Sequence, residues 1–253
     1  MRRSIAIGLG SVAWFGIAIG ACGAACPLAP QGSAHVDAVL DGRTVRLADG
    51  REVRLAGLAQ PAAKDATAAL AALVGDRDVT LRGEDDGPDR YGRQTLFIFT
   101  DDAAPSVQEA LLARGAAVYT GMLADAACAA DLAAAEALAR SARRGIWAAP
   151  DAIKNAERAG DILAVSGQFA VVEGKVVSVR QAGATFYVNF GRRWTEGFAV
   201  TISGRMIASL EAAGIAPKSL ENRRIRVRGW VEQRGGPRLE LLRAGQLEVI
   251  AER

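Results

Sequence analysis

The fold of this chain of 253 residues is decided by the stretch Asp41-Gly42-Arg43-Thr44-Val45, together with Arg54-Leu55-Ala56-Gly57-Leu58-Ala59-Gln60-Pro61-Ala62 and Asp89-Arg90-Tyr91-Gly92-Arg93. The first stretch places an Asp-Gly turn between alternating apolar segments, which predicts a β-hairpin. Outward from this hairpin we expect five short strands, with one helix between the third and fourth strands and two helices after the fifth. The strands fall at 36–40, 44–47, 52–58, 78–82 and 94–100, and the helices at 62–74, 106–114 and 131–144.

This order of elements predicts a β-barrel with helices, an α+β fold of the oligonucleotide/oligosaccharide-binding (OB) type, over residues 35–150. A second and smaller OB-like β-barrel domain is expected over residues 167–253. Its strands are predicted at 171–180, 185–190, 197–202, 223–232 and 237–242, with a helix at 206–213. Residues 151–166 are polar and rich in alanine, so they are interpreted as a linker.

The N-terminus has the composition of an export signal. Arg2 and Arg3 precede an uncharged apolar stretch, so residues 1–22 are interpreted as a signal peptide. The last part of it, Ile19-Gly20-Ala21-Cys22, resembles a bacterial lipobox. That resemblance implies that Cys22 receives a lipid and becomes the new N-terminus.

Three alternatives to lipidation remain open. They are cleavage after a small residue such as Ala34, an uncleaved membrane anchor, and export that depends on the Arg-Arg pair. We expect a lipoprotein held in the membrane on the periplasmic face of the cell envelope, or else a secreted protein. Residues 23–34, which are rich in Gly, Ala, Pro and Ser, are expected to form a tether.

Three cysteines limit the disulfide chemistry of the chain. Cys22 and Cys26 lie in the targeting region, and Cys128 is the only cysteine of the folded body. The sole intramolecular partner left for Cys128 after processing is Cys26, which is expected on the tether. We therefore interpret Cys128 as a small apolar helix residue, and the count excludes a disulfide framework.

The charges are unevenly distributed along the chain. Residues 35–150 contain 13 Lys and Arg against 17 Asp and Glu, a net charge of −4. Residues 167–253 contain 14 Lys and Arg against 8 Asp and Glu, a net charge of +6. A polyanion is therefore expected to contact the second half of the chain in preference to the first.

The three stretches quoted first resemble, in order and spacing, the active-site frame of the thermonuclease (micrococcal nuclease-like) family. The resemblance covers roughly residues 35–150 and includes the later segments 107–115 and 135–147. It implies an OB-type barrel and, for a typical member, calcium-dependent hydrolysis of phosphodiester bonds. In that chemistry a cation held by hard oxygen ligands gathers phosphate and water, and a glutamate activates the water.

The carboxylates that the resemblance assigns to this chemistry are replaced here. Arg43 and Ala59 stand where the family carries metal-binding aspartates, and Ala62 stands where it carries the glutamate. Asp41 alone remains, and a turn residue of the hairpin is its simpler interpretation. We therefore expect no metal site and no cofactor, and calcium only if the site has been rebuilt, for example with acids of the loop 84–89.

Arg54 and Arg93 match the family's two catalytic arginines, which contact the phosphate. The resemblance implies that both still bind an anion, in a charge-assisted and bidentate way. The alternative is structural pairing with Glu52 or with acids of the loop.

Substrate-binding candidates lie further along the chain. Tyr119 falls near the family's substrate pocket, and Arg226 and Arg228 belong to a basic and aromatic part of the second half. A stacking and phosphate-binding surface for nucleic acid is one hypothesis for them. The alternative is an aromatic core residue and a row of solvated arginines on alternate strand positions.

The leading functional hypothesis is an exported or lipid-anchored bacterial envelope protein. Its thermonuclease-like domain would have lost calcium-dependent phosphodiesterase activity and would act as a binding or scaffolding module. Its expected partners are nucleic acid or another polyanion at the C-terminal barrel, the membrane, and envelope proteins. The alternative is a secreted endonuclease that hydrolyses DNA or RNA with a rebuilt metal site.

Overall fold

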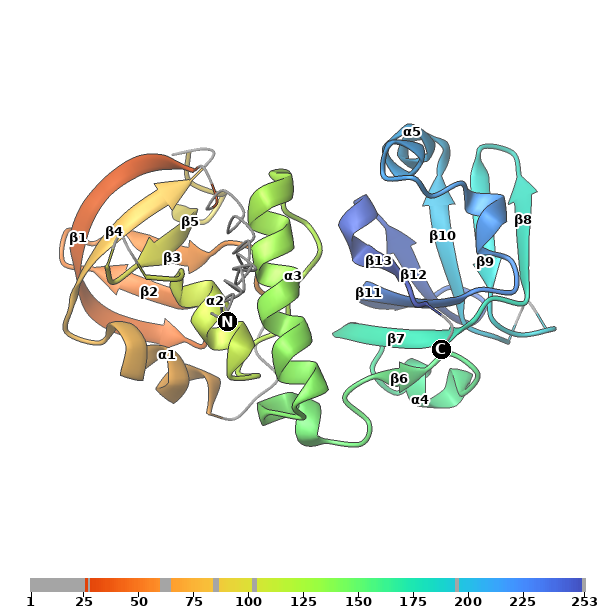
Figure 1. Cartoon of the computed structure of the whole chain (residues 1–253), viewed down its shortest axis with the longest axis horizontal. Helices are drawn as coiled ribbons and strands as arrows, with labels where there is room; N and C mark the ends of the chain where they lie inside the picture. Colours follow the sequence, from red (N-terminus) through yellow and green to blue (C-terminus); the bar gives the residue numbers. More distant parts are fainter. Residues whose placement is uncertain are drawn as a thin grey trace, which may run out of the picture.

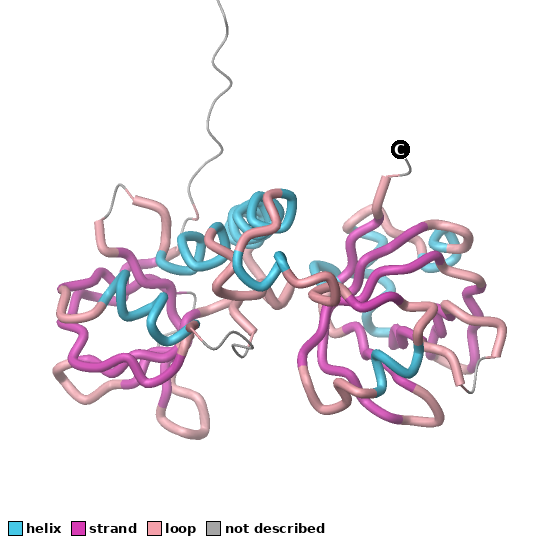
Figure 2. Tube along the Cα trace, turned by 90° about the horizontal axis from the view of Figure 1, so that it is seen from below, coloured by secondary structure: helices cyan, strands magenta, loops and turns pink. Residues whose placement is uncertain are grey.

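The computed structural model describes residues 26, 28–59, 65–83, 87–101, 104–193 and 196–251. It contains two bodies of β-structure that lie side by side, and helix α3 (Ala126–Ser141) stands between them (Figure 1). The view from below shows the same two bodies joined through a narrow region (Figure 2). The expected signal peptide, Cys22 included, lies outside the described residues. Among the residues that are described, no helix is long and apolar enough to cross a membrane.

The first body is a closed five-stranded barrel with the order β1-β2-β3-β5-β4. Strands β3 and β5 pair in parallel, and the other neighbours pair antiparallel. The strands are β1 (Ala29–Asp41), β2 (Thr44–Leu47), β3 (Glu52–Leu55), β4 (Asp78–Gly83) and β5 (Arg93–Phe99). Their inward side chains form one core with helices α1 (Ala66–Val74), α2 (Val107–Ala113) and α3.

Helices α2 and α3 begin at residues whose side chains cap them. The Ser106 hydroxyl accepts a hydrogen bond from the Glu109 backbone N–H, and the Glu109 carboxylate accepts one from the Ser106 N–H. This capping box confirms the predicted start of α2. Helix α3 begins five residues earlier than expected, because Asp125 caps it by accepting a hydrogen bond from the Cys128 N–H.

The N-terminal residues correct two expectations. Residues 29–34, expected in the tether, belong to the long strand β1 and pair with β4, from Ala29 opposite Gly83 to Ala34 opposite Val79. Cys26, also expected on the tether, forms a disulfide with Cys128 of α3. The barrel needs this long strand because β1 closes it by pairing with both β2 and β4.

The second body has the same strand order as the first. Its sheet runs β6-β7-β11-β12-β10-β9-β8, and β13 pairs with β11. Only Val176 and Val177 separate β7 from β8, so these two strands form one bent segment that counts as the first strand of the barrel. This segment pairs with β11 through β7 and with β9 through β8. As in the first barrel, the third and fifth strands, β10 and β12, pair in parallel. The predicted second OB-like barrel is therefore present.

The elements of the second body are bounded as follows. Helix α5 (Gly204–Ala212) follows the third strand, as α1 does in the first barrel. The strands are β7 (Phe169–Lys175), β8 (Ser178–Ala182), β9 (Thr185–Asn189), β10 (Ala199–Ser203), β11 (Arg224–Gln233), β12 (Pro237–Leu241) and β13 (Leu247–Val249). Short 3-10 helices occur at Gly145–Ala148, Pro217–Leu220 and Ala244–Gln246.

The expected linker is part of the second barrel. Within residues 151–166, β6 (Lys154–Asn155) pairs in parallel with β7, and α4 (Ala159–Leu163) follows it. Ala156 and Ile162 are buried in the second core. The linker expectation is therefore wrong for most of this segment, because its order comes from pairing with β7 and from packing into the second core, which local sequence does not show.

The disulfide gives a first prediction, because it joins cysteines 102 residues apart. Cys128→Ser should lower the free energy of unfolding by about 2–4 kcal/mol, since the cross-link restricts the unfolded chain. Urea denaturation with and without reductant measures this loss. Reductant should lower the midpoint of the native protein and leave that of Cys128→Ser unchanged. An equal response of the two proteins would contradict the prediction.

Candidate anion site and barrel interface

Asp41 is a structural residue of the first hairpin. One carboxylate oxygen accepts a hydrogen bond from the Arg43 N–H at 2.8 Å, and the other accepts one from the Thr44 hydroxyl at 3.2 Å. Both oxygens therefore stabilise the turn between β1 and β2. This matches the turn interpretation and leaves Asp41 without a partner carboxylate at position 43.

Arg43 reaches from the hairpin to the segment after β3. Its guanidinium Nη1 donates to the carbonyl oxygen of Leu58 at 3.2 Å, next to the buried Ala59. Burial lowers the pKa of Arg43, and the neighbouring Arg54 lowers it further, while Asp41 partly offsets both effects. Arginine nevertheless remains protonated in proteins. A fixed positive charge therefore lies beside position 59.

Arg54 and Arg93 stand on the two parallel strands of the barrel. Arg54 of β3 pairs in register with Thr95 of β5, and Arg93 begins β5 opposite Glu52. Alternate positions of a strand share a face, so the two arginines point to the same side of the sheet. The charges of Arg54 and Arg93 both act on Arg43, which places three arginines in one cluster. The fold thus brings the two predicted arginines together with Arg43.

Arg93 also has a carboxylate partner. Its Nη2 and Nε atoms donate to one oxygen of Asp89 at 2.8 and 3.1 Å, and its guanidinium lies 4.8 Å from the centre of the Tyr91 ring. These hydrogen bonds from Arg93 hold the pKa of Asp89 down at about 2. Pairing with an acid of the loop was one of the two expectations for this residue, and any anion bound here would share Arg93 with Asp89.

Arg43 and Arg54 retain buried donors. Within the part of the chain that the structure describes, the Nε atoms of both residues are buried and have no hydrogen-bond partner. An unpaired buried donor is costly, and one on a charged group more so. Two such donors in a cluster of positive charge make an arrangement that an anion would satisfy.

Where the resembling family has metal-binding carboxylates, the described residues are Arg43 and Ala59, which offer no carboxylate to a calcium ion. Calcium takes six to eight oxygen ligands, largely from carboxylates and carbonyls. The described ranges contain no group of three Asp, Glu, His or Cys side chains that could hold a metal. Asp89 is paired with Arg93, and the acids at 84–86, like position 62, lie outside the described residues.

Tyr119 is part of the first core. Its side chain is buried, and its hydroxyl has no hydrogen-bond partner among the described residues. Burial raises the pKa of the Tyr119 phenol to about 12. Its backbone pairs with Leu58, which connects it to the segment that Arg43 contacts. The core alternative holds for this residue in place of the substrate-binding role.

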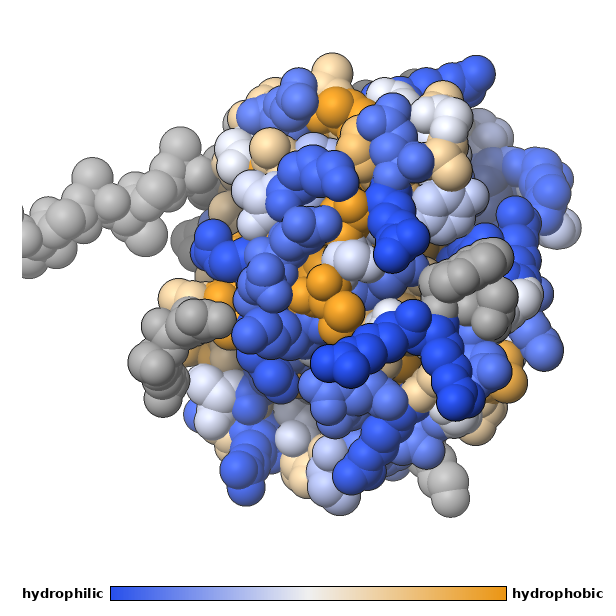
Figure 3. All heavy atoms as spheres, turned by 90° about the vertical axis from the view of Figure 1, so that its right-hand side faces the viewer, coloured by the Kyte–Doolittle hydropathy of each residue, from blue (hydrophilic) through white to orange (hydrophobic). Residues whose placement is uncertain are grey.

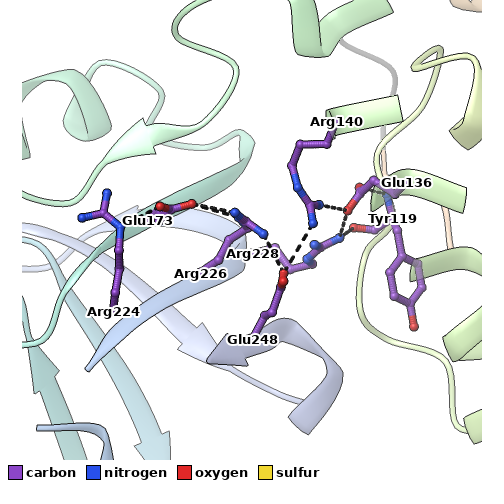
Figure 4. Close-up of polar contacts among 8 residues, drawn as sticks. All are labelled: Tyr119, Glu136, Arg140, Glu173, Arg224, Arg226, Arg228 and Glu248. Atoms are coloured by element: carbon purple, nitrogen blue, oxygen red, sulfur yellow. Dashed lines mark hydrogen bonds and ion pairs between the residues drawn. The ribbon is translucent and has the colours of Figure 1, made fainter. Parts of the chain in front are cut away.

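Arg228 lies between the two barrels. Its Nη1 donates to the Glu136 carboxylate at 2.7 Å and to the Tyr119 carbonyl oxygen at 2.8 Å, as Figure 4 shows. The Glu136 side chain is fully buried, and the Arg228 side chain is only 7% exposed. Glu136 also accepts hydrogen bonds from the Tyr119 N–H and from Arg140. Arg228 is therefore an interface residue and is not available to a surface ligand.

Arg226 is engaged in the same network. It donates to Glu173 of β7 at 2.7 Å and to Glu248 of β13 at 2.8 Å, and Arg140 of the first barrel lies 3.7 Å from Glu248 (Figure 4). The predicted basic surface at 226 and 228 is thus neutralised inside the molecule. The sequence hid this because the acidic partners are far away along the chain.

Glu136 is the functional residue that sequence reasoning missed. It lies on the buried face of α3, in the series Cys128, Leu132, Ala135, Glu136 and Ala139. A single acid on an otherwise apolar helix face requires a buried partner, because a carboxylate is rarely buried unpaired. That spacing was visible in the sequence, but nothing in it identified the partner as an arginine 92 residues away.

The interface pair gives a second prediction. Glu136→Leu should lower the free energy of unfolding by about 3–5 kcal/mol, because it leaves the buried Arg228 charge unpaired. The control is Glu248→Gln. The Glu248 carboxylate is half exposed, so this substitution should lower the free energy of unfolding by about 1 kcal/mol or less. Urea denaturation followed by circular dichroism measures both. Similar losses in the two variants would show that the buried pair has no special weight.

The Arg93–Asp89 pair gives a third prediction. Arg93→Ala should raise the pKa of Asp89 from about 2 towards the ordinary value of about 3.9. Because the folded pKa is depressed, the stabilisation by this carboxylate is present above pH of about 4 and is lost as pH falls through about 2. NMR titration of the Asp89 carboxyl carbon measures the shift. An unchanged pKa in Arg93→Ala would contradict the assignment of Arg93 as its cause.

Comparison with known protein families gives a match for the first barrel. Residues 43–149 match the family model described as staphylococcal nuclease homologue. No curated protein matches the chain. The matched segment contains the arginine cluster, helices α1 to α3 and strands β2 to β5. Residues 43–149 therefore form a domain similar to staphylococcal nuclease.

Proposed function

We propose that this protein binds nucleic acid through its staphylococcal nuclease-like barrel and does not hydrolyse it by calcium chemistry. One observation carries the proposal: the Arg43 guanidinium bonds to the Leu58 carbonyl beside Ala59. Positions 43 and 59 are those where the resembling family carries its metal-binding carboxylates. The positive charge of an arginine thus occupies the region in which such a family member holds its cation.

An arginine can replace only part of what the cation does. It supplies positive charge and hydrogen-bond donors for a phosphate oxygen. It cannot lower the pKa of a bound water, which is how a metal ion produces a nucleophile at neutral pH. With alanine at the position of the family's glutamate, the frame also lacks the side chain that would activate a water. These residues support binding of a phosphodiester without its hydrolysis.

The partnerless donors of the cluster support a phosphate as the ligand. Buried Nε atoms of Arg43 and Arg54 can donate to phosphate oxygens, and a phosphate would offset the mutual repulsion of the arginines. The first half of the chain is acidic overall, so attraction would be local to the cluster. The similarity of residues 43–149 to staphylococcal nuclease favours a nucleic acid backbone as the source of that phosphate.

An envelope location is the second part of the proposal. We propose that the chain is exported and that Cys22 carries a lipid on the periplasmic side, where envelope proteins would be further partners. The Cys26–Cys128 disulfide supports export, because structural disulfides persist mainly in oxidising compartments. Mass spectrometry of protein from the membrane fraction tests the lipid on Cys22. Recovery of an unmodified N-terminus from the soluble fraction would overturn it.

A fourth prediction tests the binding site. On titration of the purified protein with short single-stranded DNA in chelator, the Nε–H signals of Arg43 and Arg54 should shift in NMR spectra. Arg54→Ala should reduce the shift at Arg43 at least fivefold, since one donor to the same phosphate is lost. Arg46→Ala is the matched control, because Arg46 is an exposed arginine of the same barrel, paired with Asp37.

The same sample tests the absence of hydrolysis. Gel analysis of DNA and RNA should show no cleavage with calcium or with chelator. Cleavage that needs calcium and disappears in Arg54→Ala would establish the alternative, a secreted endonuclease with a rebuilt metal site. Unshifted Arg43 and Arg54 signals would overturn nucleic acid binding at this barrel.

A further inference from the structure

The second barrel carries a hollow on its outer face. The hollow has a volume of about 460 Å³, within the range of small-molecule sites. It is lined by side chains from β8, β9, β10 and β12: Arg180, Gln181, Ala182, Tyr187, Asn189, Ala199 and Arg238. Figure 3 looks onto the side of the molecule that carries β8 and β9, where a band of hydrophobic residues is bordered by hydrophilic ones.

Strand register explains why these side chains meet. Arg180 of β8 lies opposite Tyr187 of β9, and Ala199 of β10 lies between Asn189 of β9 and Arg238 of β12. Because side chains alternate between faces, these residues point outward, while Val188 between them is buried in the core. The small side chain of Ala199 leaves a depression at the centre of this face, and the longer side chains around it form the walls.

The hollow is positively charged. Two arginines line it, and no Asp or Glu side chain of the described residues does. Unlike Arg226 and Arg228, neither Arg180 nor Arg238 forms an ion pair with another residue that the structure describes. The neighbouring hollow contains Glu232 and Glu240, and Glu232 is paired there with Arg234. That hollow shares Tyr187 and Arg238 with the first one, and Glu232 lies opposite Arg238 in the strand register, so the acids border the site on the Arg238 side while Arg180 lies away from them.

Tyr187 and Arg238 contact each other within the hollow. The Arg238 guanidinium lies 5.5 Å from the centre of the Tyr187 ring, within the range of a cation–π contact. The tyrosine is only partly buried, so it remains accessible from solvent. The Tyr187 ring offers stacking for a planar group, the Arg238 guanidinium in contact with it adds positive charge, and Arg180 offers charge for an anion nearby.

We propose that this hollow binds single-stranded nucleic acid. An unpaired base stacks on Tyr187 next to Arg238, and Arg180 contacts the adjoining phosphate. A duplex is disfavoured, because its bases are already stacked and their faces are not accessible. This goes beyond the proposed function of the first barrel, since it assigns a separate site on a different domain and stands on different residues.

Binding of fluorescent oligothymidine to the full-length protein tests the proposal, in the Arg54→Ala background so that the contribution of the first barrel is reduced. Tyr187→Ala should weaken binding at least fivefold, because loss of one stacking contact has about that effect or more. Tyr187→Phe should bind as its parent, since the ring remains. The double variant Arg180→Ala/Arg238→Ala should bind more weakly than its parent. Its affinity should also depend less steeply on salt, because two positive charges are removed.

A matched control separates site binding from net charge. Arg205→Ala removes one charge from exposed helix α5 of the same barrel and should leave the affinity unchanged. Thermal unfolding of each variant confirms that the barrel is intact. The proposal is overturned if Tyr187→Ala binds as its parent, if Arg205→Ala weakens binding as much as Arg180→Ala/Arg238→Ala, or if no binding remains in Arg54→Ala. The last outcome would leave the proposed function of the first barrel standing alone.

Discussion

The arrangement of this molecule depends on one buried ion pair, Arg228 with Glu136. A fully buried carboxylate must keep its partners, because an unpaired charge away from water is very costly. Glu136 therefore fixes α3, the backbone at Tyr119 and strand β11 relative to one another. Close backbone contact completes the interface: a side chain at Gly121 would meet the Gly245 carbonyl oxygen at 2.5 Å, so the barrels meet without one there.

The interface is continuous with the arginine cluster of the first barrel. Tyr119 pairs with Leu58, the Ala59 N–H donates to the Val118 carbonyl at 2.9 Å, and Leu58 accepts the hydrogen bond from Arg43. The segment after β3 thus lies between the arginine cluster and the second barrel. Its backbone is held from both sides, which keeps the Arg43 guanidinium in one place. A pre-positioned donor loses little conformational freedom on binding an anion.

Local signals in the sequence were sufficient for much of the fold. The Asp41-Gly42 turn and the Ser106 capping box act on neighbouring residues, so their effects could be predicted. The 29–34 part of β1 could not, because its Gly, Ala, Pro and Ser residues have no strand pattern and their order comes from β4. Arg54 and Arg93 could be predicted because they lie in a motif with a fixed spacing. The disulfide of Cys128 and the ion pair of Arg228 could not be predicted in this way. Those pairs form between distant segments that only the folded chain brings together.

The disulfide has a consequence for the distance between the folded protein and a membrane. Only three residues separate Cys26 from Cys22, the proposed point of lipid attachment. Four residue steps span at most about 14 Å when fully extended. With Cys26 fastened to α3, a lipid on Cys22 would hold the first barrel against the headgroups. Such a protein would bind ligands close to the bilayer surface, because it would lack a long linker to reach further into the periplasm.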